Sequence, residues 1–214
     1  YVISGHRYQA TQQPGTVVDV SDTHYFDDDP SVASSPSLIE VNLPDLSVML
    51  TSDRGVFSAD KLDVGTKLLL LEAPPLKPND DVILDIGCGW GASGIWCAKK
   101  LGSAVTSMDA DPDVFPFLDV AADLNGVVTT PLCSRFEKLT TRQLAKFDML
   151  IAADICFWDE LVDPVCKMVN RAVKAGVKQI MIADPERPTF HEMAERCVKR
   201  HCADLVEWET RSPI

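Results

Sequence analysis

Three glycines at alternate positions, with an aspartate just ahead of them, form the stretch of this sequence with the clearest chemical use. The glycines are Gly87, Gly89 and Gly91, and Asp85 lies two positions before the first of them. A side chain at these positions would hold a ligand away from the backbone, so the spacing predicts a loop that a ligand approaches closely. The carboxylate of Asp85 would repel a pyrophosphate and attract an ammonium or sulfonium group. The stretch therefore favours a nucleotide-type cofactor that carries positive charge.

A buried strand and a helix are expected on either side of this loop. The run Val82–Ile86 is apolar and β-branched, as in a parallel strand that is covered on both faces. From Ala92 to Leu101 the apolar residues recur at helical spacing, and Gly102 is a typical residue after a helix end. The free amides at the start of this helix would face a ligand lying over the glycines.

A different cofactor fits part of the same pattern. Gly89, Gly91 and Gly94 satisfy the dinucleotide fingerprint G-x-G-x-x-G, and Asp109 lies 20 residues beyond Gly89, where that class has its ribose-binding acid. This alternative predicts an NAD(P)-dependent oxidoreductase, but it does not account for the acid at position 85. A third alternative is a glycine-rich turn without a ligand, in a binding subunit that is no enzyme.

The segment Asp85-Ile86-Gly87-Cys88-Gly89-Trp90-Gly91 resembles, residue for residue, motif I (D-x-G-x-G-x-G) of class I S-adenosylmethionine-dependent methyltransferases. The resemblance implies an α/β fold with a Rossmann-like doubly wound sheet, and S-adenosyl-L-methionine as cofactor. Asp109, at the end of the second predicted strand, would accept hydrogen bonds from the ribose hydroxyls. The adenine edge would meet Ser134 or Arg135, where the family usually has an acid. The expected cofactor contacts in and after motif I are Asp85, Gly87, Cys88, Gly89, Gly91, Asp109, Ala110 and Ser134.

Candidate catalytic residues follow the fourth predicted strand, at 147–155. Ligands of open parallel sheets bind beyond the carboxyl ends of the strands, so Asp154, Phe157 and Trp158 are expected to face the transferred methyl group. A lysine acceptor must first lose a proton, and a carboxylate beside aromatic faces can take that proton or hold the amine. The plainer alternative is that Asp154 caps the following helix.

The first half of the chain resembles one branch of the methyltransferases. Residues 43–71 contain LPD, DRGVFS and LDVGTKLLLL, and they look like the region before motif I in small-type ribosomal RNA guanine-N2 methyltransferases. The resemblance implies that Phe57 and the pair Gly65-Thr66 lie beside the cofactor. For Phe57, packing in the core is an equally good interpretation.

The second half resembles another branch. Asp154-x-x-Phe157 is similar to the D-x-x-Y/F motif of seven-strand protein-lysine methyltransferases. Ala183-Asp184-Pro185-x-Arg187 looks like the A-D-P-G-R of the nicotinamide N-methyltransferase-like and electron-transfer-flavoprotein lysine methyltransferases, with Glu186 in place of the glycine. Arg187 would otherwise pair with Glu186 or a nearby acid on the surface. The N-P-P-F/Y tetrapeptide of nucleic-acid amine methylases is absent from the end of the fourth strand.

The charge of the chain disfavours a nucleic acid as substrate. Its 20 Lys and Arg residues stand against 32 Asp and Glu residues, a net charge of −12. No basic cluster is longer than Lys99-Lys100 or Lys199-Arg200, so the surface is expected to repel phosphate backbones. We therefore expect a protein side chain or a small amine as the methyl acceptor.

The seven cysteines form no C-x-x-C pair, and most lie in apolar segments. We expect them to be small core residues of a protein in the reducing cytoplasm, without a bound metal. The spacing of Cys197, His201 and Cys202 suits no usual zinc ligand set. No apolar run approaches the roughly 18 residues of a membrane span.

Two parts are expected along the chain, an N-terminal extension (1–58) with a β-hairpin and a methyltransferase domain (59–214). The apolar alternation around Pro44-Asp45 predicts the hairpin. Thr189 is expected to cap a helix that ends near residue 201, and 203–210 to form a sixth strand. The family's remaining strand would come from the hairpin or from a second subunit of a homodimer.

Overall fold

The computed structural model describes residues 37–52, 62–72 and 81–207. The strands are β1 (Ser37–Asn42), β2 (Ser47–Ser52), β3 (Val82–Ile86), β4 (Ala104–Asp109), β5 (Thr129–Cys133), β6 (Met149–Ala153) and β7 (Gln179–Ala183). The helices are α1 (Val64–Glu72), α2 (Ala92–Leu101), α3 (Phe115–Asn125), α4 (Thr141–Leu144), α5 (Asp159–Ala175) and α6 (Pro188–His201), with the 3₁₀ turns η1 (Pro112–Val114) and η2 (Phe136–Lys138).

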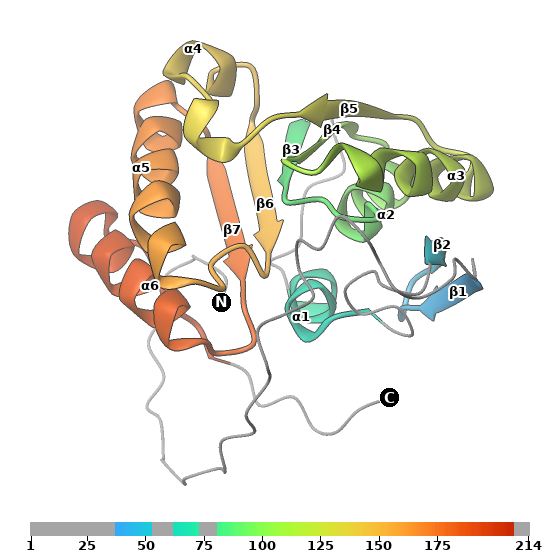
Figure 1. Cartoon of the computed structure of the whole chain (residues 1–214), viewed down its shortest axis with the longest axis horizontal. Coiled ribbons are helices and arrows are strands. Elements are labelled where there is room, and N and C mark those ends of the chain that lie inside the picture. Colours follow the sequence, from blue (N-terminus) through green and yellow to red (C-terminus); the bar gives the residue numbers. More distant parts are fainter. Residues whose placement is uncertain (1–36, 53–61, 73–80, 208–214) are drawn as a thin grey trace, which may run out of the picture.

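The centre of the molecule is a five-stranded parallel sheet in the order β5-β4-β3-β6-β7 (Figure 1). The chain runs outward from β3 to β5, then returns to the other side of β3 to add β6 and β7. The strand order therefore reverses between β3 and β6. In open α/β sheets, ligands bind at such a reversal, beyond the carboxyl ends of the strands. The predicted Rossmann-like doubly wound fold class is confirmed.

Helices cover both faces of the sheet. Alternate side chains of each strand point to opposite faces, so every central strand contributes to two apolar layers. One layer lies under α5 and α6 and includes Leu84, Ile86, Leu150, Ile182, Val165 and Phe190. The other lies under α1 and α2 and includes Ile83, Val105, Ile151, Met181, Leu69 and Cys97.

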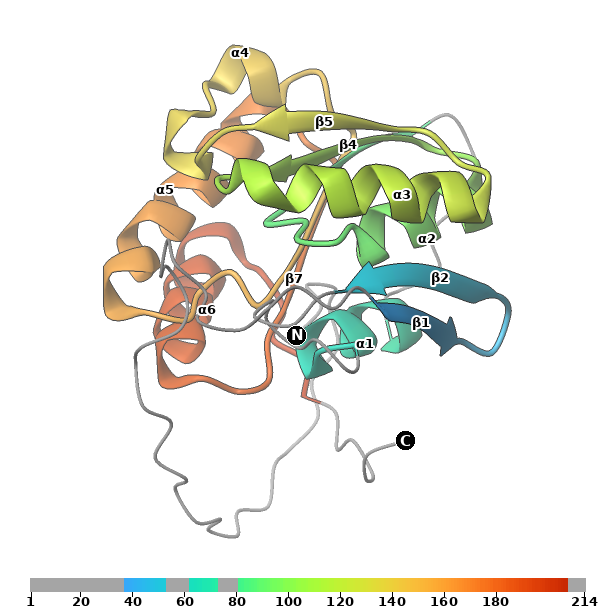
Figure 2. The same cartoon turned by 45° about the vertical axis from the view of Figure 1, so that its right-hand side comes forward.

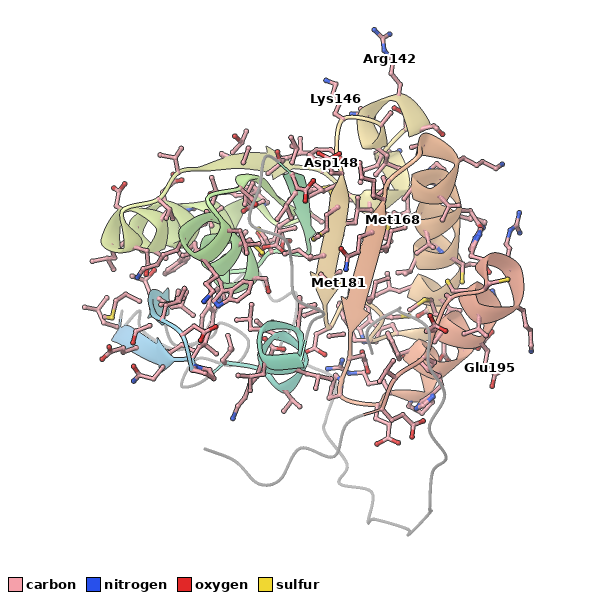
Figure 3. The ribbon with its side chains drawn as sticks, turned by 180° about the vertical axis from the view of Figure 1, so that it is seen from behind. Arg142, Lys146, Asp148, Met168, Met181 and Glu195 are labelled. Carbon is pink, nitrogen blue, oxygen red and sulfur yellow. The ribbon has the colours of Figure 1, made fainter. Side chains whose placement is uncertain are left out.

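Asp148 stabilises the end of the sheet where the parallel strands begin, opposite to their carboxyl ends. Its carboxylate accepts a hydrogen bond from the Val82 amide at 3.0 Å and pairs with the Lys178 ammonium at 2.7 Å. In Figure 3 the labelled Asp148 lies at this amino-terminal end, away from Met181 midway along the edge strand β7. The contacts join the starts of β3 and β6 to the residue before β7.

The predicted hairpin is confirmed as β1 and β2, which form a separate antiparallel sheet. Val48 and Leu50 pack against Ile95 of α2 and Leu118 of α3. The Asn125 side chain holds the backbone of the residue between them, because it accepts from the Met49 amide at 3.0 Å and donates to the Met49 carbonyl at 2.6 Å. Figure 2 shows the hairpin beside α1 and α2. The idea that it completes the main sheet is wrong.

Another prediction fails at the end of the chain. Residues 203–207 form no strand, and the rest of the predicted sixth strand lies outside the described residues. Within α5, Pro164 is the sixth residue, so the helix lacks one hydrogen bond there.

The predicted cap of α6 is also wrong. The residue before the helix is Arg187, which makes no side-chain cap, and Pro188 begins the helix. The Thr189 hydroxyl donates instead to the Cys156 carbonyl in the segment before α5. Proline has no amide hydrogen to satisfy, so the first turn depends less on a capping side chain. Thr189 thereby connects two segments that are 33 residues apart.

Candidate functional site

The glycine loop between β3 and α2 contains two kinds of glycine. Gly87, Gly89 and Gly91 all have positive φ angles, of 67°, 49° and 86°. A Cβ at Gly91 would lie 2.1 Å from Cδ1 of Leu118, so this glycine is required for packing against α3. In the part of the chain that the structure describes, a Cβ at Gly89 would have no atom within 4 Å. These residues leave the backbone at Gly89 accessible, and its contact with a ligand stays a prediction.

The carboxylate of Asp109, at the end of β4, holds this loop. The Gly89 amide donates to its Oδ2 at 2.9 Å, and the Asp111 amide donates to Oδ1 at 3.0 Å. The backbone carbonyl of Asp109 accepts from the Ser134 amide at 2.8 Å, which brings Ser134 beside it. Ala110 follows directly. Each carboxylate oxygen retains a lone pair, so Asp109 can still accept hydrogen bonds from a ligand.

Asp85 lies beneath the loop and does not line its surface. It is only 2% exposed, and its Oδ2 accepts a hydrogen bond from the Gly94 amide at 2.9 Å. Burial raises the pKa of Asp85 to about 7, against the opposing effect of the Gly94 hydrogen bond. The fixed, ligand-facing charge expected from the sequence is thus replaced by a buried carboxyl that titrates near neutral pH.

Gly94 explains how α2 comes so close to this carboxyl. A Cβ on Gly94 would lie 2.9 Å from Oδ2 of Asp85 and 3.0 Å from Oγ of Ser107. The third glycine of the dinucleotide fingerprint serves here in the packing of the helix on the sheet. Because dinucleotide-binding folds use it for the same purpose, Gly94 does not distinguish the two cofactor classes.

We expect the stability of the ligand-free protein to fall as the pH rises from 5 to 8, in part because of Asp85. A carboxyl whose pKa is raised on folding contributes stability that is present below its unfolded pKa, 3.8, and lost as the pH rises through about 7. Asp85→Asn should remove about 2 to 4 kcal/mol of that decline. Urea unfolding at both pH values measures it, with exposed Asp123→Asn as control. An unchanged pH dependence in Asp85→Asn would contradict the assignment.

The second half of the site is built around Asp154, just after β6. Its backbone has a φ of +55°, and the Arg187 guanidinium donates to its Oδ1 at 2.6 Å. The same Nη1 atom lies 2.9 Å from Oδ2 of Asp184, and the Arg187 amide donates to Oδ1 of Asp184 at 2.8 Å. Arg187 therefore joins two carboxylates of different strand ends. The alternative of a pair with a nearby acid is borne out, but the acids are Asp154 and the buried Asp184, and not Glu186 on the surface.

The first turn of α1 packs against this cluster. A Cβ at Gly65 would lie 2.9 Å from Oδ1 of Asp154. Asp63 caps the helix, because its Oδ1 accepts from the Thr66 amide at 2.7 Å, and it also bonds to Asp154. Thr66 is buried beside them. The pair Gly65-Thr66 thus meets Asp154, while Phe57 lies outside the described residues.

The surroundings of Asp154 favour its protonated form. Burial and the neighbouring Asp63 carboxylate raise the pKa of Asp154 to about 7, although Arg187 acts in the opposite direction. Asp154 does not cap α5, since the residue before that helix is Trp158. The helix-cap alternative for Asp154 is wrong. A carboxyl poised near neutral pH is suited to accept a proton.

Two aromatic side chains follow Asp154 in the chain. The rings of Phe157 and Trp158 meet edge to face with their centres 4.7 Å apart, and Trp158 is 40% exposed. Ile155, between them and Asp154 in sequence, reaches the glycine loop, because a Cβ on Gly87 would lie 2.7 Å from its Cγ2. This contact connects the two halves of the site.

Two features of this cluster could not be predicted from the sequence: the bond from Asp63 to Asp154 and the link from Arg187 to Asp154. An aspartate before a helical run is an ordinary cap signal, and nothing local shows that its carboxyl also reaches Asp154. Glu186 replaces a glycine of the resembled motif, yet it has a φ of +80°, the conformation that glycine favours. The loop shape is therefore kept despite the substitution.

The described residues contain neither a metal-binding cluster nor a helix that could span a membrane. Among residues 37–52, 62–72 and 81–207, no group of three or more His, Cys, Asp or Glu side chains is arranged to hold a metal ion. In the same part of the chain, no helix combines the length and apolar character that crossing a bilayer needs.

Known proteins resemble this chain in sequence and in fold. The electron transfer flavoprotein beta subunit lysine methyltransferase of Rattus norvegicus is 27% identical over 215 residues, which covers 93% of this chain and 80% of the relative. For the protein of the same name in Xenopus laevis, the identity is 28% over 139 residues. That alignment covers 65% of this chain and about half (54%) of the relative.

A solved structure shares the fold. The 16S rRNA N2 G1207 methyltransferase of T. thermophilus, solved with AdoMet and guanosine, has a TM-score of 0.55 and 20% identity. The match covers 78% of this chain and 47% of that one. At this identity the likeness supports the fold alone.

A protein-family model that matches half of the 214 residues identifies the family. Residues 47–153, from β2 to the end of β6, match the model of the methyltransferase small domain. The match includes the glycine loop and crosses the predicted boundary at residue 58, which stays a prediction. It decides against an oxidoreductase and agrees with the motif I resemblance. The chain therefore belongs to the methyltransferase small domain family.

Proposed function

We propose that the chain is an S-adenosylmethionine-dependent methyltransferase that modifies the side-chain amine of a lysine in a partner protein. The observation that carries the proposal is the position of Asp154. This half-buried carboxyl, with a pKa near 7, lies at the carboxyl end of β6, beside the glycine loop and just before two aromatic residues. A lysine amine needs such a proton acceptor before it can be methylated.

The residues present fit the cofactor. The open backbone at Gly89 would accept close contact, and Asp109, with free lone pairs, would bind hydroxyl groups. Gly87, Cys88, Ala110 and Ser134 complete the expected contacts. Asp85, buried below them, would gain negative charge when a cation lies above it, because an opposite charge lowers the pKa of a carboxyl. When bound, the cofactor supplies a methyl group on a positively charged sulfur.

The chain's own residues would act on the acceptor. Asp154 would hold the lysine ammonium and take its proton, while Arg187 keeps the carboxylate in place through its bonds to Asp154 and Asp184. Phe157 and Trp158 would attract the cationic amine by their ring faces and lower its pKa by excluding water. Alignment of the amine with the methyl group then supplies most of the rate.

Two observations support a protein as the methyl acceptor, namely the net charge of this chain and the names of its relatives. A net charge of −12 suits a basic protein segment better than an RNA backbone. The rat and frog relatives are named for methylation of an electron transfer flavoprotein beta subunit, so that protein is the first acceptor to test. Ribosomal RNA is the second candidate, because residues 43–71 resemble the region before motif I in ribosomal RNA guanine-N2 methyltransferases.

We expect S-adenosylhomocysteine to bind in calorimetry at micromolar concentration and NADH not to bind. Incubation with radiolabelled S-adenosylmethionine and either the flavoprotein subunit or a cell lysate should then label protease-sensitive material. Label that is lost on nuclease treatment would replace the lysine proposal by RNA methylation. Binding of NADH, with no response to S-adenosylhomocysteine, would overturn the function altogether.

Compartment and assembly belong to the same proposal. We propose the cytoplasm, supported by the free thiols of all described cysteines. A homodimer stays a proposal as well, and sedimentation of the full chain would test it.

A further inference from the structure

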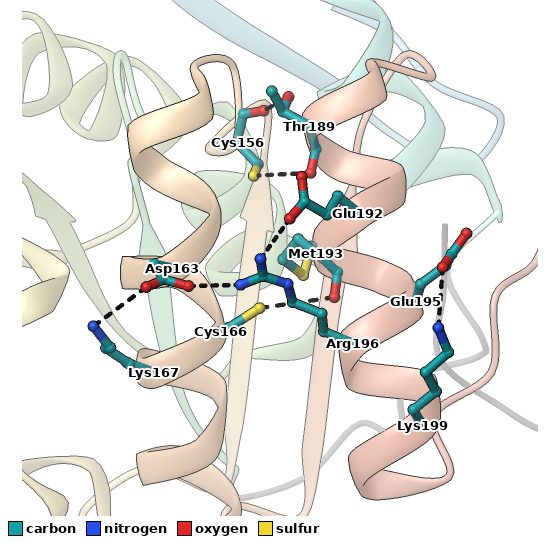
Figure 4. A network of polar contacts seen from close by, with 10 residues as sticks. All are labelled: Cys156, Asp163, Cys166, Lys167, Thr189, Glu192, Met193, Glu195, Arg196 and Lys199. Atoms are coloured by element: carbon teal, nitrogen blue, oxygen red, sulfur yellow. Dashed lines mark hydrogen bonds and ion pairs between the residues drawn. The ribbon is translucent and has the colours of Figure 1, made fainter.

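Three sulfur-bearing residues, Cys166, Met193 and Cys197, gather where α5 packs against α6. Figure 4 shows Cys166 and Met193 at this place. Cys166 lies on α5 and Cys197 on α6, and the Cys197 thiol bonds to the Cys166 sulfur. The Cys166 sulfur also lies 3.9 Å from the Met193 carbonyl, and the Cys197 sulfur lies 3.7 Å from the Met193 sulfur. The two thiols thus lie on facing helices, each beside Met193.

A groove of about 510 Å³ opens onto this pair. Its floor includes both thiols, but they differ in access, because Cys166 is partly exposed and Cys197 is only 4% exposed. A small molecule in the groove would therefore meet Cys166 first. Positive charges outnumber negative ones in the lining, where Lys167, Arg196, Lys199 and Arg200 stand against the single carboxylate of Asp163.

The charges around Cys166 favour its thiolate. The bond from the Cys197 thiol, followed by the neighbouring Arg196 guanidinium, lowers the pKa of Cys166 to about 7, against burial and the Asp163 carboxylate. Arg196 is fixed by Asp163 at 2.6 Å and by Glu192 (Figure 4). The pKa of Cys197 is raised instead, so its thiol keeps its proton. A thiolate is the nucleophilic form of cysteine.

The third thiol of this region does not compete. Cys156 is buried, its sulfur lies 3.6 Å from the Thr189 carbonyl, and burial raises its pKa to about 12.

We propose that Cys166 is a site of oxidation by hydroperoxides, and that Cys197 resolves the product into a disulfide that cross-links α5 to α6.

The hydroperoxide is the oxidant, which accepts two electrons in the first step. The Cys166 thiolate attacks an oxygen of the peroxide, the O–O bond breaks, and an S–O bond forms as sulfur gives two electrons to the oxidant. With hydrogen peroxide the products are the sulfenic acid of Cys166 and hydroxide. Oxidation removes the negative charge of Cys166, the main cause of the raised Cys197 pKa, so the Cys197 thiol can now release its proton. Its sulfur attacks the Cys166 sulfur, the S–O bond breaks, and the departing hydroxide takes the proton and leaves as water.

The test is treatment of the full chain with hydrogen peroxide at neutral pH, followed by mass spectrometry of unreduced peptides. We expect a disulfide between the peptides of Cys166 and Cys197. Before oxidation, iodoacetamide should label Cys166 about 5-fold or more faster than the exposed Cys133 and Cys202. Faster labelling of these two exposed thiols, or a disulfide that joins other cysteines, would overturn the proposal.

Variants separate the two roles. Cys197→Ser should leave a sulfenic acid at Cys166 that dimedone traps, whereas Cys166→Ser should give neither disulfide nor dimedone adduct at Cys197. Arg196→Ala should slow labelling of Cys166 several-fold, and Lys199→Ala, a cation on the same helix that pairs with Glu195, should not. Equal effects of the two would overturn the role of Arg196. No step uses methyl transfer, so the outcome is independent of the proposed function.

Discussion

Gly89→Val is expected to abolish binding of S-adenosylhomocysteine while the protein stays folded. A Cβ at Gly89 meets no atom within 4 Å, so the valine side chain would not clash inside the protein and would project over the glycine loop. There it would occupy the space that a ligand needs for contact with the backbone. Calorimetry should show an affinity at least about 100-fold weaker, because close backbone contact at such loops allows no side chain.

The backbone strain of this substitution needs its own control. Gly89 has a φ of +49°, which a β-branched residue adopts only at a cost of about 1 to 2 kcal/mol. Gly102, at the other end of α2, has a φ of +68° and also no neighbour within 4 Å of a built Cβ. Gly102→Val should therefore lower the melting temperature similarly and leave binding intact. Equal loss of binding in both variants would show that α2 stability, and not the ligand contact, is responsible.

The unit from β3 to β4 could be predicted from sequence because its signals are local. An apolar β-branched run, three glycines and a helix stopped by Gly102 lie in one continuous stretch, and each element was found where it was expected. Asp109 was placed correctly at the end of the next strand for the same reason. The hairpin followed from alternation around one turn.

The cluster at Asp154 could be predicted only in part, because it is assembled from distant segments. Arg187 lies 33 residues after Asp154 in the sequence, and Asp63 precedes the glycine loop whereas Asp154 follows it. Proximity of this kind follows from strand order, which sequence periodicity does not contain. Burial has the same origin, so the raised pKa values of Asp85 and Asp154 could not be predicted either. The predicted cap at Thr189 failed because its hydroxyl donates to the Cys156 carbonyl, a tertiary contact that overrides the local preference.

Asp154→Asn is expected to lower kcat by about 100-fold or more, the usual contribution of a positioned proton acceptor, while cofactor affinity changes less than about 3-fold. Asparagine tolerates the φ of +55° at this position, and its carbonyl oxygen can still accept the hydrogen bond from Arg187. The variant therefore removes the ability to take a proton and little else. Asp154→Ala would be a less specific test than Asp154→Asn, because it would also remove the hydrogen bond from Arg187.

Two comparisons separate proton transfer from support of the loop. In the wild type, kcat/KM should rise with pH through about 7 as Asp154 of the free enzyme loses its proton, and Asp154→Asn should lack this rise. Asp184→Asn alters the other carboxylate on Arg187, 2.9 Å from the same nitrogen, and should keep both the rise and most of the activity. If Asp184→Asn loses as much kcat as Asp154→Asn, or if Asp154→Asn loses cofactor affinity and kcat equally, Asp154 only supports the loop. A proton acceptor requires the pH dependence and the kcat effect to disappear together, because both arise from the same carboxylate.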